Sequence, residues 1–385
     1  MFLDIVEKRN PDLLKAALSL HQKGEILPDS YILDLDAILA NGRMLLEEAE
    51  KRGIKLYAMT KQFGRVPLIA KKLVEMGFAG IVTVDFKEAE TMMNHGIKLG
   101  NIGHLVQIPS SMVEKVVSQN PEIITVYSLD KMREIDRAAK KLGKIQSVML
   151  RVLEKESRIY SGQKGGFYLE ELENLISDSK DLKNIRIEGI TSFPCFLYDG
   201  ERNSIEKTSN VETIHKAKKI LEDIGIQVSQ LNMPSATSLE NMRSIELAGG
   251  THGEPGHALT GTTPFNSRNP SGEIPAIVYV SEISHNLDRS PFSYGGGHYR
   301  RSGMENALVG NSFQNLKRVK IEAPSPESID YYFEIDSNER VGDTVLSAFR
   351  TQIFVTRSDV AVVEGISKGE PKLVGIFDSF GREKI

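Results

Sequence analysis

Short apolar runs alternate with longer segments of helical period from about residue 54 to residue 260. The runs are rich in β-branched residues, and this alternation is typical of βα units around a parallel sheet. Eight runs occur, at residues 55–61, 79–85, 104–109, 124–128, 147–152, 186–193, 227–233 and 244–250. Eight is the strand count of a TIM barrel. The pattern therefore predicts an α/β fold with a (β/α)8 barrel over residues 54–265.

The segments between the runs carry apolar stripes with helical spacing. Three of these stripes end just before Gly77, Gly143 and Gly225. Glycine at this place suits the left-handed position that ends a helix. The sequence thus predicts where these three helices stop.

The pattern of apolar and polar residues changes after residue 265. Residues 266–275 form a linker rich in Pro, Gly and Asn, and strand-like runs without long helices follow it, at residues 276–285, 316–323, 331–336, 352–357 and 372–377. We therefore expect a mostly-β C-terminal domain over residues 266–385. Residues 1–53 contain a predicted helix at 11–22, a strand-like stretch at 31–37 and a second predicted helix at 37–53. We expect these elements to pack on the barrel and on the β domain.

Composition and charge narrow the class of protein. The formal net charge is -4, and the basic residues are scattered among the acidic ones, which argues against nucleic acid as a partner. Cys195 is the only cysteine, so an internal disulfide framework is excluded and a reducing compartment fits best. We see no secretory signal and no apolar stretch long enough to cross a bilayer. These features predict a cytoplasmic protein without a nucleic-acid or membrane partner.

The order of elements and several local motifs resemble one family. SYILDLDAILANGRML is similar to the opening strand and helix of alanine racemases, and GIVTVDFKEAETMMNHGI is similar to their second strand and following helix. The chain thus resembles the alanine racemase-like enzymes of fold type III, which depend on pyridoxal 5'-phosphate (PLP). The segment LYAMTKQFGR is most similar to the uncharacterised bacterial YhfX-like group. The resemblance covers residues 30–265 and weakens in the C-terminal domain.

Lys61 follows the first strand-like run, just before a turn glycine. Barrel enzymes keep their chemistry at the carboxyl ends of the strands. By position alone, a solvated lysine flanking a strand is the better interpretation of Lys61. The resemblance implies that Lys61 holds PLP as a Schiff base, in a homodimer whose active sites are shared between subunits.

The resemblance also implies a phosphate site in the loops after strands seven and eight, here MPSATS and GEPGHALTGTT. In the first loop, Ser235, Thr237 and Ser238 offer hydroxyl groups beside an expected helix start, where they could instead only cap the helix. In the second loop, glycines let the backbone approach a ligand closely, and a histidine stands where related decarboxylases have an arginine. These residues are Gly256, Gly261 and His257.

Glu254 is the main departure from alanine racemases, which carry an arginine facing the pyridine nitrogen at the matching position. EPG at residues 254–256 resembles instead the EPGR motif of fold type III decarboxylases, whose glutamate pairs with a protonated pyridine nitrogen. A carboxylate there favours the charged ring, which is a stronger electron sink. The alternative is an exposed carboxylate in a Glu-Pro-Gly turn.

SPFSYGGGHYRRSG resembles the racemase segment that supplies the second base. We expect Tyr294 in this role, with Tyr299 as the fallback and Arg300 or Arg301 lowering its pKa; the alternative is a tyrosine packed in a hairpin turn. Lys164 falls nearest the position of the racemase arginine that touches the cofactor phenolate. Arg158 is an alternative for that contact, and either residue could be a solvated loop charge.

Two further residues are expected to face the barrel interior. Arg151 stands where racemases have an inward lysine, and a barrel-lining charge must find a partner. His104 either has its hydrogen bonds satisfied inside the barrel or lines the pocket. No histidines and carboxylates have metal-ligand spacing.

The leading hypothesis is a PLP-dependent amino-acid racemase or epimerase, an isomerase, that exchanges the α-proton with two bases, Lys61 and Tyr294. A fold type III decarboxylase is the first alternative, favoured by Glu254. It is disfavoured because those enzymes need a cysteine in the C-terminal domain, whereas Cys195 lies in the barrel. A noncatalytic PLP carrier is the second alternative, disfavoured by the additional β domain.

Overall fold

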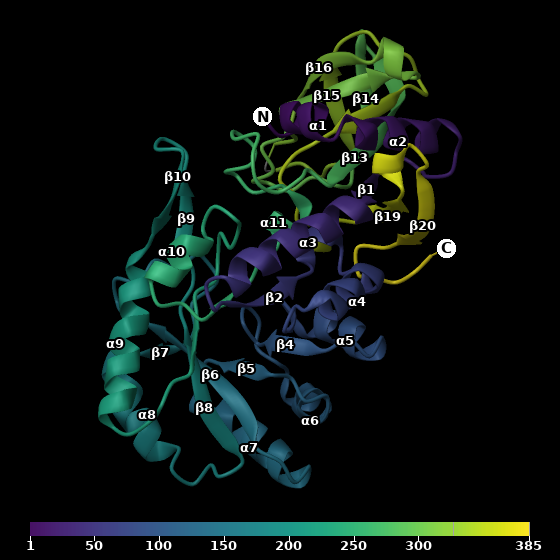
Figure 1. Cartoon of the computed structure of the whole chain (residues 1–385). Coiled ribbons are helices and arrows are strands. Elements are labelled where there is room, and N and C mark those ends of the chain that lie inside the picture. Colours follow the sequence, from purple (N-terminus) through teal and green to yellow (C-terminus); the bar gives the residue numbers. More distant parts are fainter. Residues whose placement is uncertain (326, 385) are drawn as a thin grey trace. The chain divides into compact units, whose positions relative to one another are not determined.

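The computed structural model describes residues 1–325 and 327–384. Its internal contacts divide the chain into two compact units, each described by itself below (Figure 1). The barrel unit comprises residues 45–60 and 70–256. The sheet unit comprises residues 1–44, 61–69 and the chain from residue 257 onward.

Eight parallel strands close into a ring in the barrel unit. In order around the ring they are β2 (Lys55–Met59), β3 (Gly80–Val82), β4 (Leu99–Ile102), β5 (Ile123–Val126), β6 (Gln146–Leu153), β8 (Ile185–Thr191), β11 (Gln230–Asn232) and β12 (His252–Gly253). The pairing of β12 with β2 completes the ring. The predicted (β/α)8 barrel is confirmed.

The helices that alternate with these strands are short to medium in length. They are α4 (Pro67–Met76), α5 (Phe86–Asn94), α6 (Val113–Ser118), α7 (Leu129–Lys141), α8 (Leu172–Asp178), α9 (Ser209–Asp223) and α10 (Met242–Leu247). Gly77, Gly143 and Gly225 follow the ends of α4, α7 and α9 with φ of 126°, 66° and 88°, as their positions predict. Within the described residues, no helix is long and apolar enough to cross a membrane.

Three predicted strands are wrong. The run at 104–109 lies beyond β4, whose own sequence, LGNI, carries too few apolar side chains to stand out. The run at 244–250 falls largely in α10, where Met242 and Ile245 are buried at helical spacing. The run at 352–357 contains a 3-10 turn, Ile353–Val355. In each run one isoleucine is buried, Ile108, Ile245 or Ile353, while another large apolar side chain is exposed. An apolar run therefore need not pair as a strand.

The sheet unit contains one nine-stranded sheet. Its strands are β14 (Ser290–Tyr294), β17 (Tyr332–Asp336), β16 (Lys317–Ile321), β15 (Asn306–Gly310), β18 (Thr344–Ser347), β13 (Ile277–Leu287), β1 (Ser30–Asp34), β19 (Asp359–Glu364) and β20 (Lys372–Phe377), in spatial order. The long strand β13 also pairs with β14, which closes six of the strands on themselves. A mostly-β C-terminal fold is thus observed.

The N-terminal strand belongs to this sheet. β1 pairs antiparallel with β13 and parallel with β19. Helices α1 (Phe2–Arg9) and α2 (Pro11–Gln22) bury their apolar faces in a core that includes Val278 of β13 and Leu346 of β18. Helix α3 (Leu35–Glu50) follows β1 directly.

Candidate active site

Glu254 follows β12 directly and turns its carboxylate into the barrel. Its Oε1 accepts hydrogen bonds from Asn101 Nδ2 at 3.0 Å and Asn232 Nδ2 at 2.7 Å. His104 Nε2 lies 3.3 Å from Oε2, and both side chains are only 1% exposed. Within the described residues, no hydrogen bond to Oε2 is completed. β4 and β12 are separated by β2 and β3, so the Asn101 contact crosses the barrel interior. The exposed-turn alternative for Glu254 is wrong.

Neighbouring strands hold this group in place. Thr237 Oγ1 accepts a hydrogen bond from the Glu254 N–H at 3.0 Å. Thr125 Oγ1 donates to Asn101 Oδ1 at 2.7 Å, which leaves the amide nitrogen to face Glu254. The amide N–H groups of Asn101 and Asn232 thus fix the position of the Glu254 carboxylate.

Arg151 extends from β6 and is fully buried. Its Nη1 donates to Tyr127 Oη at 2.5 Å and its Nη2 to the Gln163 carbonyl at 2.9 Å. The partner expected for a barrel-lining charge is therefore present, as a phenol and a carbonyl. The Tyr127 hydroxyl in turn donates to the His104 carbonyl. Burial raises the pKa of Tyr127, Arg151 lowers it, and the charge of Glu254 raises it further.

The hydroxyl groups in the loop after β11 form hydrogen bonds with backbone groups of the barrel unit. Ser235 Oγ accepts from the Phe196 N–H at 3.2 Å and donates to the Phe196 carbonyl. Ser238 Oγ donates to the Ala236 carbonyl at 3.1 Å, and Thr237 binds the Glu254 backbone. Helix α10 begins only at Met242, so the expected helix start at these residues is wrong. Phosphate contact by Ser235, Thr237 and Ser238 stays a prediction.

Gly256 and Gly261 have different surroundings. Gly256 is buried beside Pro255. Gly261 has φ of 63°, and a Cβ there would collide with the Ile274 carbonyl. Backbone packing therefore accounts for Gly261, while its approach to a ligand stays a prediction.

Lys61 opens a 3-10 turn, Lys61–Phe63, in the sheet unit and is half-buried. His257 opens α11 (His257–Thr260) in the same unit. Burial, followed by the positive charges of Arg350, Lys61 and Arg301, lowers the pKa of His257 well below its ordinary value of 6.5. Lys61 thus lies within electrostatic range of a neutral imidazole.

Two side chains from the segment after β18 contact this histidine. Arg350 Nε donates to His257 Nε2 at 3.0 Å, and Gln352 Nε2 lies 3.4 Å from the same atom. Because Nε2 accepts, Nδ1 carries the hydrogen and donates to Thr262 Oγ1 at 3.0 Å. His257 therefore does not supply the positive charge of the arginine that it replaces.

Within the barrel unit, the chain leaves β2 and β12 at neighbouring positions. The Met59 N–H donates to the Pro255 carbonyl at 2.9 Å in the barrel unit, two residues before Lys61 and His257 respectively. Lys61 therefore follows the carboxyl end of the first barrel strand, as predicted. The preceding Thr60 donates its hydroxyl hydrogen to the buried carboxylate of Glu88.

Tyr294 ends β14 and is 37% exposed. It faces Tyr332 of β17 across the strands, with ring centroids 6.1 Å apart. It lies in a strand, so the hairpin-turn alternative is wrong, and its role as a base stays a prediction. Tyr299 Oη accepts a hydrogen bond from Arg301 Nε at 2.9 Å, which gives the direction of that arginine.

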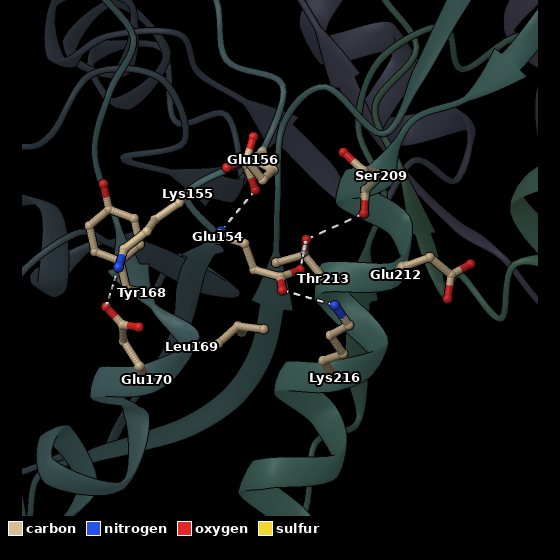
Figure 2. Close-up of a pocket in the computed structure, with 11 residues that line it drawn as sticks. Glu154, Lys155, Glu156, Tyr168, Leu169, Glu170, Ser209, Glu212, Thr213 and Lys216 are labelled. Carbon is tan, nitrogen blue, oxygen red and sulfur yellow. Dashed lines mark hydrogen bonds and ion pairs between the residues drawn. The ribbon is translucent and has the colours of Figure 1, made fainter.

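The loop between β6 and β7 (Phe167–Tyr168) carries Lys164 and Arg158, both at least partly exposed. Figure 2 shows an open pocket of about 570 Å³ between this loop and α9. Four of its charged side chains form two pairs: Lys216 Nζ lies 2.9 Å from Glu154 Oε1, and Lys155 Nζ lies 3.8 Å from Glu170 Oε1. Neither Lys164 nor Arg158 lines the pocket. Their contact with a cofactor stays a prediction.

Cys195 is buried, and its Sγ donates to the Ser192 carbonyl at 3.1 Å. Burial raises the pKa of this thiol, which suits a structural cysteine rather than a nucleophile. Within residues 1–325 and 327–384, no cluster of three metal-ligating side chains occurs.

Sequence reasoning missed several polar residues of the site. Asn101 was hidden because β4 was misplaced, and Arg350 lies in a segment whose role no local pattern reveals. Asn232 had a usable signal, since it is a polar residue at the carboxyl end of an apolar run.

Two family models match the chain. The alanine racemase N-terminal domain matches residues 33–264, and the YhfX-like C-terminal domain matches residues 278–373. The uncharacterised protein YhfX of Escherichia coli (strain K12) is 44% identical over 382 residues, which is 99% of each chain.

Solved structures share the fold at low sequence identity. D-threonine aldolase from Filomicrobium marinum has a TM-score of 0.66 at 16% identity and covers 92% of this chain and 95% of its own. Alanine racemase from Clostridium difficile 630 has a TM-score of 0.63 at 17% identity, with coverage of 91% and 98%. Diaminopimelate decarboxylase from M. jannaschii has a TM-score of 0.63 at 13% identity, with coverage of 92% and 89%. Three different reactions thus occur on this architecture.

Proposed function

The chain belongs to the alanine racemase-like family and to its YhfX-like group, and from this premise we propose that it is a PLP-dependent amino-acid racemase or epimerase. PLP dependence is a property of the family. The observation that supports cofactor binding here is the Glu254 carboxylate at the barrel rim. Its Oε1 already accepts two amide N–H groups, whereas Oε2, with His104 Nε2 at 3.3 Å, receives no completed hydrogen bond within the described residues. A protonated ring nitrogen is a donor of the required kind.

When bound, PLP withdraws electrons from the substrate's α-carbon, and a protonated ring does so more strongly. Lys61 Nζ would hold the cofactor covalently, and Glu254 would hold the ring nitrogen. The loops at 233–238 and 253–261 would hold the phosphate through their backbone amides, and Ser235, Thr237 and Ser238 would contribute hydroxyl groups by exchanging their present hydrogen bonds within the barrel unit.

Racemisation needs proton exchange on both faces of the α-carbon. Lys61 Nζ, released from the cofactor by the incoming amine, would move the proton on one face. The Tyr294 hydroxyl, supplied by a second subunit, would move it on the other. The exposure of Tyr294 at the end of β14 is compatible with such a shared site. Cytoplasmic location and the homodimer stay predictions.

Amino-acid decarboxylation is the second candidate, because Glu254 within an EPG motif is the feature that those enzymes share with this chain. The buried Cys195 and the lack of any cysteine after residue 265 disfavour it.

The decisive experiment measures both reactions on the same amino acids. We expect the purified protein with PLP to wash deuterium from heavy water into the α-position without releasing carbon dioxide. Lys61→Ala should lose this exchange, the yellow absorbance of the bound cofactor and the cofactor fixed by borohydride. Carbon dioxide release would favour the decarboxylase, and reducible cofactor at undiminished stoichiometry in Lys61→Ala would assign PLP to another lysine.

A further inference from the structure

His104 contacts Glu254, the carboxylate that the proposed function assigns to the cofactor's ring nitrogen. Its Nε2 lies 3.3 Å from Glu254 Oε2, and both side chains are 1% exposed. An imidazole nitrogen and a carboxylate oxygen attract at this distance only if the nitrogen carries a hydrogen, since two lone pairs repel. With its hydrogen on Nε2, His104 would therefore present an N–H group to Oε2.

The other polar groups around Glu254 support a role for this contact. Glu254 receives two amide groups on Oε1, so His104 is the polar side chain at the other oxygen. Tyr57, Tyr127 and Cys195 also lie within electrostatic range of Glu254, but burial raises the pKa of each of these groups and keeps it uncharged. Arg151, the cation on β6, is directed at Tyr127 and Gln163. His104 is thus placed to oppose the cost of burying the negative charge.

Ring packing and a backbone hydrogen bond hold His104 in place beside Glu254. The ring of His104 packs edge-on against Phe193 with centroids 5.5 Å apart, and its backbone carbonyl accepts from Tyr127. The segment 103–106 that carries it follows β4 directly, so Asn101 and His104 approach Glu254 from the same side of the barrel.

We propose that His104 is a positioning residue that orients the Glu254 carboxylate as the acceptor for the cofactor's ring nitrogen. This inference rests on the proposed function, because it assigns the ring nitrogen to Glu254. Without His104, Oε2 would lose the polar side chain beside it, and the carboxylate would be less firmly oriented toward the ring nitrogen.

The test compares the affinity of the apoprotein for PLP with its affinity for 1-deaza-PLP, in which a C–H group replaces the ring nitrogen. The ratio of the two affinities isolates the contact at that nitrogen, and it needs no turnover. We expect His104→Phe, which keeps an aromatic ring beside Phe193, to lower the ratio on the order of 10- to 100-fold, as for loss of a hydrogen bond to a charged group. His104→Gln, which restores an N–H, should recover most of the ratio.

His252 provides a matched control within the same barrel. It is buried, stacks on Tyr57 at 5.3 Å, and has its Nε2 3.8 Å from Glu122 Oε1. His252→Gln should therefore leave the affinity ratio unchanged. If His104→Phe does not fold, His104→Leu takes its place with the same expectation.

Three results would overturn the role of His104: an unchanged ratio in His104→Phe, equal losses of affinity for both cofactors, or a loss in His104→Gln as large as in His104→Phe. Glu254→Gln separates this failure from that of the proposed function. If Glu254→Gln loses the ratio and His104→Phe keeps it, only the inference about His104 fails. If Glu254→Gln keeps the ratio, the assignment of Glu254 to the ring nitrogen fails as well.

Discussion

Asp29 is the residue whose buried charge should govern how stability varies with pH. Its carboxylate accepts from Tyr279 Oη at 3.0 Å and from the Ser358 hydroxyl. Burial raises its pKa from the ordinary 3.8 to about 6, against the lowering by these hydrogen bonds. The folded protein therefore binds this proton more tightly than the unfolded chain does, and the resulting stabilisation is lost as the pH rises from about 4 through 6.

Asp29→Asn keeps an acceptor for Tyr279 and removes the charge. We expect the variant and the wild type to have similar free energies of unfolding near pH 4. At pH 7 the variant should be more stable by about 1–3 kcal/mol, since one unit of pKa corresponds to about 1.4 kcal/mol. Urea unfolding at several pH values measures the difference, with Asp12→Asn, at a half-exposed side chain of α2, as the control. A difference that does not change with pH would contradict the assignment.

At the scale of an element, the turn after α11 depends on the absence of a side chain at Gly261. Gly143, after α7, has a similar φ of 66°, but a Cβ added there would have no atom within 4 Å. Gly143→Ala should cost only the left-handed conformation, about 1 kcal/mol. Gly261→Ala should cost clearly more, because the methyl group would also meet the Ile274 carbonyl. Thermal unfolding of the two variants tests this, and equal losses would mean that the turn relaxes easily.

At the scale of the whole molecule, the proposed active site shared between subunits predicts how much activity mixed dimers of two variants should have. Lys61→Ala and Tyr294→Phe should each be inactive or nearly so. In a hybrid of the two, one site carries both changes and the other carries neither if Tyr294 acts across the interface. Refolding an equal mixture should then restore about a quarter of the wild-type α-proton exchange, since half of the dimers are hybrids. If Tyr294 serves its own subunit, every site is defective and no activity returns.

Local patterns determined much of the barrel. Alternating apolar runs and helical stripes depend only on neighbouring residues, so they predicted a (β/α)8 barrel and the helix ends at Gly77, Gly143 and Gly225. They also placed Lys61 just beyond the first strand. The eighth strand was misjudged because β12 has two residues, too few to show a period.

The sequence by itself thus determined the barrel, the lysine at its rim and the unusual Glu254. Only the tertiary structure decided what surrounds that glutamate, because Asn101 and His104 at β4 and Asn232 on β11 are distant in sequence from one another and meet Glu254 through barrel closure. Likewise, only the long-range pairing of β1 with β13 and β19 joins the start of the chain to its end. Periodicity records which face of an element is buried, whereas contacts between distant elements depend on how those faces pack together.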